Sequence, residues 1–194
     1  MPTHPFLIQK KIMACDLTKG RKEPCSDSVG GLRKIYFTDF GDLGTVTKTN
    51  DEITDLSGTF TAFAYELKGT SSFEQAITSS RENGTTFFEQ TLNVTLKKLT
   101  KEDHKEIKLL CYNRPHIAVE TNNGEVFLMG LEYGSEVTGG TIVTGAAMGD
   151  LSGYTLTFVA QEVEPANFLE TPTAADPYAG MAAATVTITQ GTNS

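Results

Sequence analysis

The sequence predicts a mainly β protein: a β-sandwich or barrel with one flanking α-helix, long loops and terminal arms. Two long segments, 86–97 and 154–161, alternate apolar and polar residues as strands with one solvated face do. A single segment, 101–113, carries the start and stop signals of a helix. Turn signals such as Asn83-Gly84 separate these elements. A chain of 194 residues is long enough to bury a substantial core.

We divide the chain into three parts. Residues 1–31 form a predicted N-terminal arm, because they are rich in Lys, Pro, Gly and Ser without a hydrophobic period. Residues 32–169 form the predicted sandwich domain. Residues 170–194 form a C-terminal extension, which holds many alanines and no basic residue, and in which only 185–189 reads as a strand.

The elements of the sandwich domain follow from local patterns. Residues 51–57 are expected to be a loop or a weak strand, and 72–77 a short helical or irregular segment. Residues 134–153 are rich in glycine and are expected to form turns. The remaining strands are predicted at 32–37, 44–48, 59–68, 86–97, 116–120, 125–129 and 154–161, the fifth and sixth joined by the Asn122-Asn123-Gly124 turn.

The two clearest strands each have an apolar face and a polar face. The expected buried positions are Phe88, Leu92, Val94, Leu96, Tyr154, Leu156, Phe158 and Ala160. The expected solvated positions are Glu89, Thr91, Asn93, Thr95, Lys97, Thr155, Thr157 and Gln161.

Capping and charge signals define the helix. Thr100 is the expected N-cap, the acidic pair Glu102-Asp103 complements the helix dipole, and Pro115 forbids continuation. Ile107, Leu110 and Cys111 form the apolar stripe, and we expect Cys111 to be a buried, inert thiol.

Charge is distributed unevenly along the chain. The total is −8, but residues 1–34 carry seven Lys/Arg and three Asp/Glu, whereas the remainder carries nine and 21. A body this acidic repels nucleic-acid phosphates, so a conventional nucleic-acid binder is not expected. The basic arm is suited to an acidic surface, such as that of a second copy of the chain.

Sequence motifs for catalysis, cofactors and metals are missing. The chain has no nucleophile elbow or phosphate-binding loop, and Ser135 lacks a catalytic context. The spacing of Cys15 and Cys25 does not fit a zinc site with His4 and His104. We therefore expect a protein that is not an enzyme and holds no cofactor or metal. Three cysteines, an N-terminus unlike a signal peptide, and only short apolar runs predict a cytoplasmic protein without membrane insertion.

Three runs resemble bacteriophage tail-tube and related virion proteins. They are Gly149–Phe158 with the following Glu162-Val163-Glu164-Pro165-Ala166, Cys25–Phe37, and Glu82–Leu92. The resemblance implies a virion tail subunit, assembled in the host cytoplasm, that forms stacked hexameric rings around a lumen and has no catalytic residues. Its implied partners are further copies of itself, other tail or neck proteins and, transiently, the phage DNA that passes through the lumen.

The resemblance also assigns roles to particular residues. The lumen-facing candidates are the solvated positions named above: Glu89, Thr91, Asn93, Thr95, Lys97, Thr155, Thr157 and Gln161. The candidates for contacts between rings are Lys10, Lys11, Lys19, Arg21, Lys22, Asp42, Lys48 and Asp51.

Other interpretations stay open at this level. The alternating pattern alone favours a monomeric β-sandwich with a solvated outer face over an assembling sheet. A neck, tail-terminator or other connector ring protein has the same sandwich-and-helix build. A binding or adhesin module is less consistent with the composition, because tryptophan is absent and most aromatic residues fall on core positions. An enzyme would need a polar constellation around His104 or His116.

Overall fold

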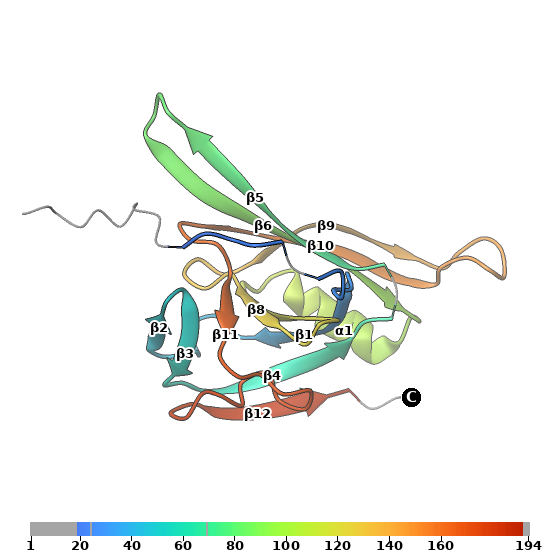
Figure 1. Cartoon of the computed structure of the whole chain (residues 1–194). Coiled ribbons are helices and arrows are strands. Elements are labelled where there is room, and N and C mark those ends of the chain that lie inside the picture. The colour runs from blue at the N-terminus through green and yellow to red at the C-terminus, as the bar shows by residue number, and fades with distance from the viewer. Residues whose placement is uncertain (1–18, 24, 69, 192–194) are drawn as a thin grey trace, which may run out of the picture.

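The computed structural model describes residues 19–23, 25–68 and 70–191. They form two packed β-sheets and a single α-helix, α1, which flanks the sandwich, and this confirms the predicted fold class (Figure 1). No helix among these residues is long and apolar enough to span a membrane.

The larger sheet has eight strands in the order β12-β4-β1-β7-β8-β11-β3-β2. Its strands are β1 (Leu32–Thr38), β2 (Val46–Thr49), β3 (Glu52–Leu56), β4 (Thr59–Glu66), β7 (His116–Thr121), β8 (Val126–Met129), β11 (Asn167–Leu169) and β12 (Thr185–Gln190). Strand β12, from the segment expected to be a C-terminal extension, pairs in parallel with β4 and so extends this sheet.

The smaller sheet has four strands in the order β5-β6-β10-β9, all antiparallel. They are β5 (Ser72–Ser80), β6 (Thr85–Lys97), β9 (Glu136–Val143) and β10 (Gly153–Glu162). The long β6 and β10 pair over ten residues at the centre of the sheet, from Gly153 opposite Lys97 to Glu162 opposite Phe88.

The main core lies between the two sheets. Leu92 and Val94 of β6 pack with Phe158 of β10 against Ile35 and Val119 of the larger sheet. All of these side chains are buried, so the inward face predicted for β6 and β10 is confirmed. A second apolar cluster on the other face of the larger sheet includes two side chains from the 170–184 segment, Tyr178 and Met181.

The helix α1 (Lys101–Leu110) begins at the predicted cap, where the Thr100 side chain accepts a hydrogen bond from the backbone N–H of Asp103 at 3.0 Å. Its Ile107 is buried in the main core. The helix ends three residues before the predicted end. Cys111, which lies just past the last helical residue, is exposed, so the expectation of a buried thiol was wrong.

Two other local predictions were also wrong. Residues 72–77, expected to be helical or irregular, belong to β5, and the glycine-rich segment 134–153 contains β9. Residues 51–57 contain the short strand β3, which agrees with the strand alternative expected for them. In the two wrong cases strand pairing decided the structure. β5 pairs with β6 along its length, and β9 pairs with β10. The hydrogen bonds of these ladders satisfy the backbone groups of both edge strands, and a local sequence pattern does not reveal such pairing.

Candidate functional site

The outer face of the four-stranded sheet gathers all eight residues predicted to face a lumen. On β6 and β10, Thr95 lies opposite Thr155, Asn93 opposite Thr157, and Glu89 opposite Gln161. Directly opposed residues of neighbouring strands point to the same side of a sheet. The eight side chains therefore lie on one largely polar surface on the side away from the core, which they share with Val159, opposite Thr91. The structure shows that these residues share one face. That the face lines a lumen is a proposal.

Hydrogen bonds join these side chains across the strands. Thr157 Oγ1 donates to Asn93 Oδ1 at 2.9 Å, and Gln161 Nε2 donates to Glu89 Oε2 at 3.1 Å. Thr95 Oγ1 donates to the carbonyl oxygen of Thr70 at 3.1 Å. These bonds tie side chains of the face to one another and to the backbone across neighbouring strands.

The flanking strands extend this face with residues that sequence reasoning missed. On β9, Thr141 is paired with Thr155, and their hydroxyl oxygens lie 2.6 Å apart. On β5, Glu74 is paired with Thr91. The β-branched run Thr141-Ile142-Val143 was the available signal for β9, but the surrounding glycines concealed it. The outer face, as we use the term below, is the solvated side of β5, β6, β10 and β9.

Acidic side chains outnumber basic ones on the outer face. Glu74, Glu89 and Glu136 lie on it together with Lys97. Arg114, from the loop before β7, reaches Glu136 at 3.7 Å in an exposed ion pair. The surface potential of the face is therefore weakly negative.

Both edges of the four-stranded sheet are unpaired within the described chain. β5 pairs with β6 alone, and β9 pairs with β10 alone. Unpaired edges of this length present rows of backbone N–H and C=O groups that can accept another strand. The hairpin formed by β5 and β6 projects beyond the sandwich at one end, and the β9–β10 connection projects at the other (Figure 1).

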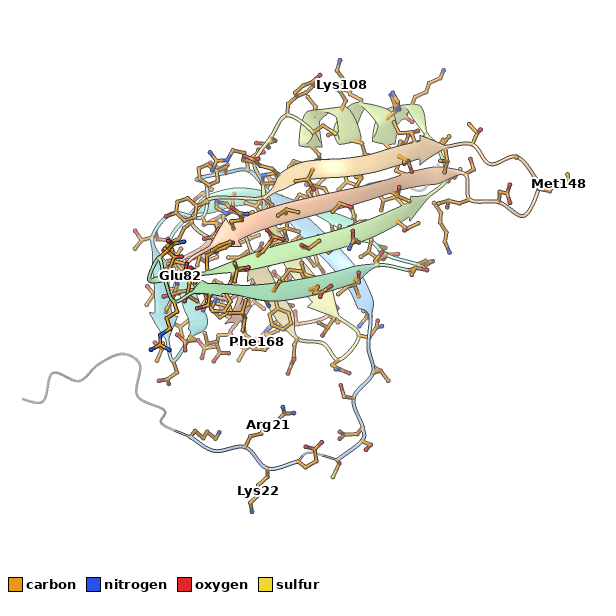
Figure 2. The ribbon with its side chains drawn as sticks, turned by 90° about the horizontal axis from the view of Figure 1, so that it is seen from above. Arg21, Lys22, Glu82, Lys108, Met148 and Phe168 are labelled. Atoms are coloured by element: carbon orange, nitrogen blue, oxygen red, sulfur yellow. The ribbon has the colours of Figure 1, made fainter. Side chains whose placement is uncertain are left out.

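The residues proposed for contacts between rings lie apart from this face. Lys19, Arg21 and Lys22 are exposed on an extended segment that runs alongside the body on the β5 side (Figure 2). The Asn122-Asn123-Gly124 turn anchors the end of this segment. There Asn123 Oδ1 accepts a hydrogen bond from Val29 N at 3.0 Å, and Asn122 Nδ2 donates to Gly30 O at 2.8 Å. Lys10 and Lys11 lie outside the described residues.

The remaining three of these candidates surround β2 and β3. Asp42 lies in the loop before β2, and Asp51 in the turn between β2 and β3 has a positive φ of 62°. Lys48 makes an ion pair within the chain, because its Nζ lies 2.6 Å from Glu164 Oε2. Lys48 therefore already has a carboxylate partner.

A buried polar cluster closes one end of the sandwich. Gln90 Oε1 accepts a hydrogen bond from Gly130 N at 3.0 Å, and Glu162 Oε1 accepts from the backbone N–H groups of Glu132 and Tyr133 at 3.1 and 3.0 Å. Burial raises the pKa of Glu162, and its two backbone hydrogen bonds oppose that rise. Each of these buried side chains holds the 130–133 loop in place, which is a structural role.

Among the described residues, no group of three or more His, Cys, Asp and Glu side chains is placed to hold a metal ion. Searches against protein-family models, curated proteins and solved structures find no match for this chain. The outer face and its two edges are therefore the features of this chain that bear on its function.

Proposed function

We propose that this chain is a virion structural protein, a subunit of a bacteriophage tail tube, in which copies join edge to edge around a lumen. The observation that carries the proposal is the four-stranded sheet, which has a buried apolar face, a polar outer face and two unpaired edges. Joining copies at these edges satisfies the exposed backbone groups of both edge strands.

The strand directions favour closure into a ring. The order β5-β6-β10-β9 contains three antiparallel steps, so β9 runs opposite to β5. In a ring of copies around an axis along the strands, β9 of one copy therefore meets β5 of the next as an antiparallel pair. Six copies of the four-stranded sheet, the ring size implied by the tail-tube resemblance, would form a barrel with six times four strands. Barrels of about 16 to 18 strands already enclose an aqueous channel.

The chemistry of the outer face suits the passage of DNA. Its threonine, asparagine and glutamine side chains are hydrogen bonded to one another, and its charge is weakly negative. With Lys97 as its one basic strand residue against three glutamates, such a wall attracts phosphates too weakly to retain the nucleic acid, so DNA slides through and is bound only transiently. No catalytic step is involved.

The ends of the sheet favour stacking of rings. The β5–β6 tip near Glu82 and the β9–β10 tip near Met148 lie at opposite ends of the outer face (Figure 2). Met148 is fully exposed. Together with the exposed Lys19, Arg21 and Lys22, these tips would contact the next ring, or other tail and neck proteins, in a virion tail built in the host cytoplasm.

Electron microscopy and sedimentation velocity of the concentrated protein test the proposal. We expect rings with a central hole, stacked into tubes. Ile142→Lys places a charge on the β9 edge, where Ile142 is 54% exposed, and should prevent ring closure. Met148→Lys makes the same change at a loop tip and should leave single rings intact. Rings that never stack would favour a neck or terminator connector, and a strictly monomeric wild-type protein would overturn the proposal.

A further inference from the structure

The outward side of helix α1 carries apolar side chains that the fold leaves exposed. Leu109 is 52% exposed and Tyr112, just past the helix end, is 81% exposed. Both lie on the side of the helix opposite the buried Ile107, together with Lys105 and Glu102. Lys108 borders this group. We call these four residues, Lys105, Lys108, Leu109 and Tyr112, the helix stripe.

A row of aromatic rings lies on the other flank of the sandwich. Phe73 of β5 lies 5.8 Å from Phe127 of β8, and Phe127 lies 4.3 Å from Phe168 of β11, both measured between ring centroids. Phe168 is 41% exposed, so the row opens to solvent. Glu52, opposite Phe168 on β3, and Glu125, just before β8, border it. We call these five residues the aromatic wall.

The helix stripe and the aromatic wall lie on opposite flanks of one molecule. Viewed onto the outer face, α1 with Lys108 lies beyond the β9 edge, and Phe168 lies on the β5 side (Figure 2). The two surfaces therefore cannot meet within a chain. When β9 of one copy pairs with β5 of the next, as in the proposed function, the helix stripe of the first copy is brought toward the aromatic wall of the second.

We propose that the helix stripe of each copy docks on the aromatic wall of the next copy. The inference rests on the proposed edge pairing for its geometry and adds a second layer of contact beneath the barrel. Leu109 and Tyr112 cover the exposed rim of Phe168, and this buries apolar surface on both copies. Lys105 and Lys108 face Glu52 and Glu125, so the charges at the border are complementary.

The docking has a physical consequence for the ring. Backbone hydrogen bonds between two exposed edge strands compete with water and specify register weakly. An apolar contact behind the paired edges excludes water from them on the core side. The direction of docking is also fixed, because each copy offers one helix stripe and one aromatic wall, and such head-to-tail contacts generate closed rings when the rotation closes.

Disulfide trapping tests the contact directly. In a Cys15→Ser, Cys25→Ser, Cys111→Ser background, a chain with both Tyr112→Cys and Phe168→Cys is oxidised with diamide and run on a non-reducing denaturing gel. Because the two positions lie on opposite flanks, we expect a ladder of covalent oligomers that ends at the ring number. The two single-cysteine chains are the controls, and each can give dimers at most.

A second measurement keeps the contact testable without cysteines. Tyr112→Asp and Phe168→Ser should each raise the concentration needed for ring formation by about 10-fold or more, as the loss of a central apolar contact does. Met148→Asp, at a loop tip, should leave that concentration unchanged. Circular dichroism and melting temperature confirm that each monomer is folded.

The outcomes separate the two proposals. If the wild type forms rings but the double-cysteine chain gives no ladder beyond dimers, the docking is overturned and the tail-tube proposal is unaffected. A ladder without rings or tubes would support the docking and overturn the tube. A monomeric wild type that gives no ladder would overturn both.

Discussion

His116 Nε2 accepts a hydrogen bond from the backbone N–H of Gly41 at 3.1 Å, while Nδ1 of the same ring lies 2.6 Å from the carbonyl oxygen of Gly130. A carbonyl oxygen only accepts, so the proton resides on Nδ1 and the imidazole is neutral. Phe40 stacks on the ring at a centroid distance of 5.0 Å. The neutral histidine thus ties the 39–45 and 130–135 loops to the start of β7.

This geometry predicts that acid weakens the fold through His116. Burial lowers the pKa of His116, and the hydrogen bond to Gly130 and the nearby carboxylate of Asp42 oppose that effect. The folded state therefore binds fewer protons than the unfolded state as pH falls below about 6.5, the ordinary value for histidine. The free energy of unfolding should decrease there by at most about 1.4 kcal/mol per pH unit, the limit for one proton.

Urea denaturation at pH 7.5 and 5.5 measures this loss. His116→Gln removes the titrating group and should reduce the difference between the two pH values. His104→Gln removes an exposed histidine on α1 and is the matched control, which should retain the wild-type difference. An equal loss of stability in all three proteins would show that other groups carry the acid response.

Two adjacent glycines of β9 should respond in opposite ways to alanine. A Cβ on Gly140 would lie 2.4 Å from the carbonyl oxygen of Thr155, so Gly140→Ala forces the β9 and β10 backbones apart. We expect a cost of about 1 to 3 kcal/mol, typical of overpacking. A Cβ on Gly139 meets no atom within 4 Å, and Gly139→Ala should be neutral. Thermal denaturation compares them, and equal effects would mean that the β9 register is different.

Removing the N-cap of α1 should lower the stability of the protein by a smaller amount. Thr100→Ala removes the hydroxyl that accepts a hydrogen bond from Asp103 N and should lower the free energy of unfolding by about 1 kcal/mol. Thr100→Ser keeps the acceptor and is the matched control. A chemical denaturation curve for each variant checks the difference, and an alanine variant as stable as the serine variant would contradict the capping role.

The two faces of the central strands should differ sharply in their tolerance of substitution. Leu92→Asp or Phe158→Asp buries an unpaired charge at positions with no exposed surface and should prevent folding. Glu89→Gln and Thr157→Val, on the outer face, should fold with little change in melting temperature. Soluble expression and far-UV circular dichroism distinguish the two sets, and equal tolerance would mean that the faces are reversed.

Alternation predicted β6 and β10 well because their burial is one-sided. Every second residue of β10 from Tyr154 to Ala160 is buried, so the apolar residues of the sequence follow the two-residue period of the strand. The polar faces of both strands were predicted in this way, but the pairing of Thr95 with Thr155 and of Asn93 with Thr157, which joins them into the outer face, comes from the structure. The candidate site was predictable to that extent.

The edge strands were not predictable in the same way. β5 has an exposed Ile77 and a half-buried Phe73, because part of the β5–β6 hairpin projects beyond the core. A strand that is solvated on both faces carries no alternation. β9 contains two glycines. Its pairing with β10 leaves no room for a side chain at Gly140, whereas Gly139 has open space around it. The two edges on which the proposed assembly depends are therefore the parts that local pattern describes least.

The charge of the outer face leads to a last prediction. Glu74→Lys combined with Glu89→Lys turns a weakly negative wall into a positive one, while both positions stay solvated. Assembled wild-type protein should not retain duplex DNA in about 0.15 M salt, whereas the variant should bind it with an affinity that falls steeply as salt rises. Glu66→Lys with Asp27→Lys makes the same charge change away from that face. Equal DNA retention by both double variants in a filter-binding assay would mean that net charge, rather than a lumen wall, governs the interaction.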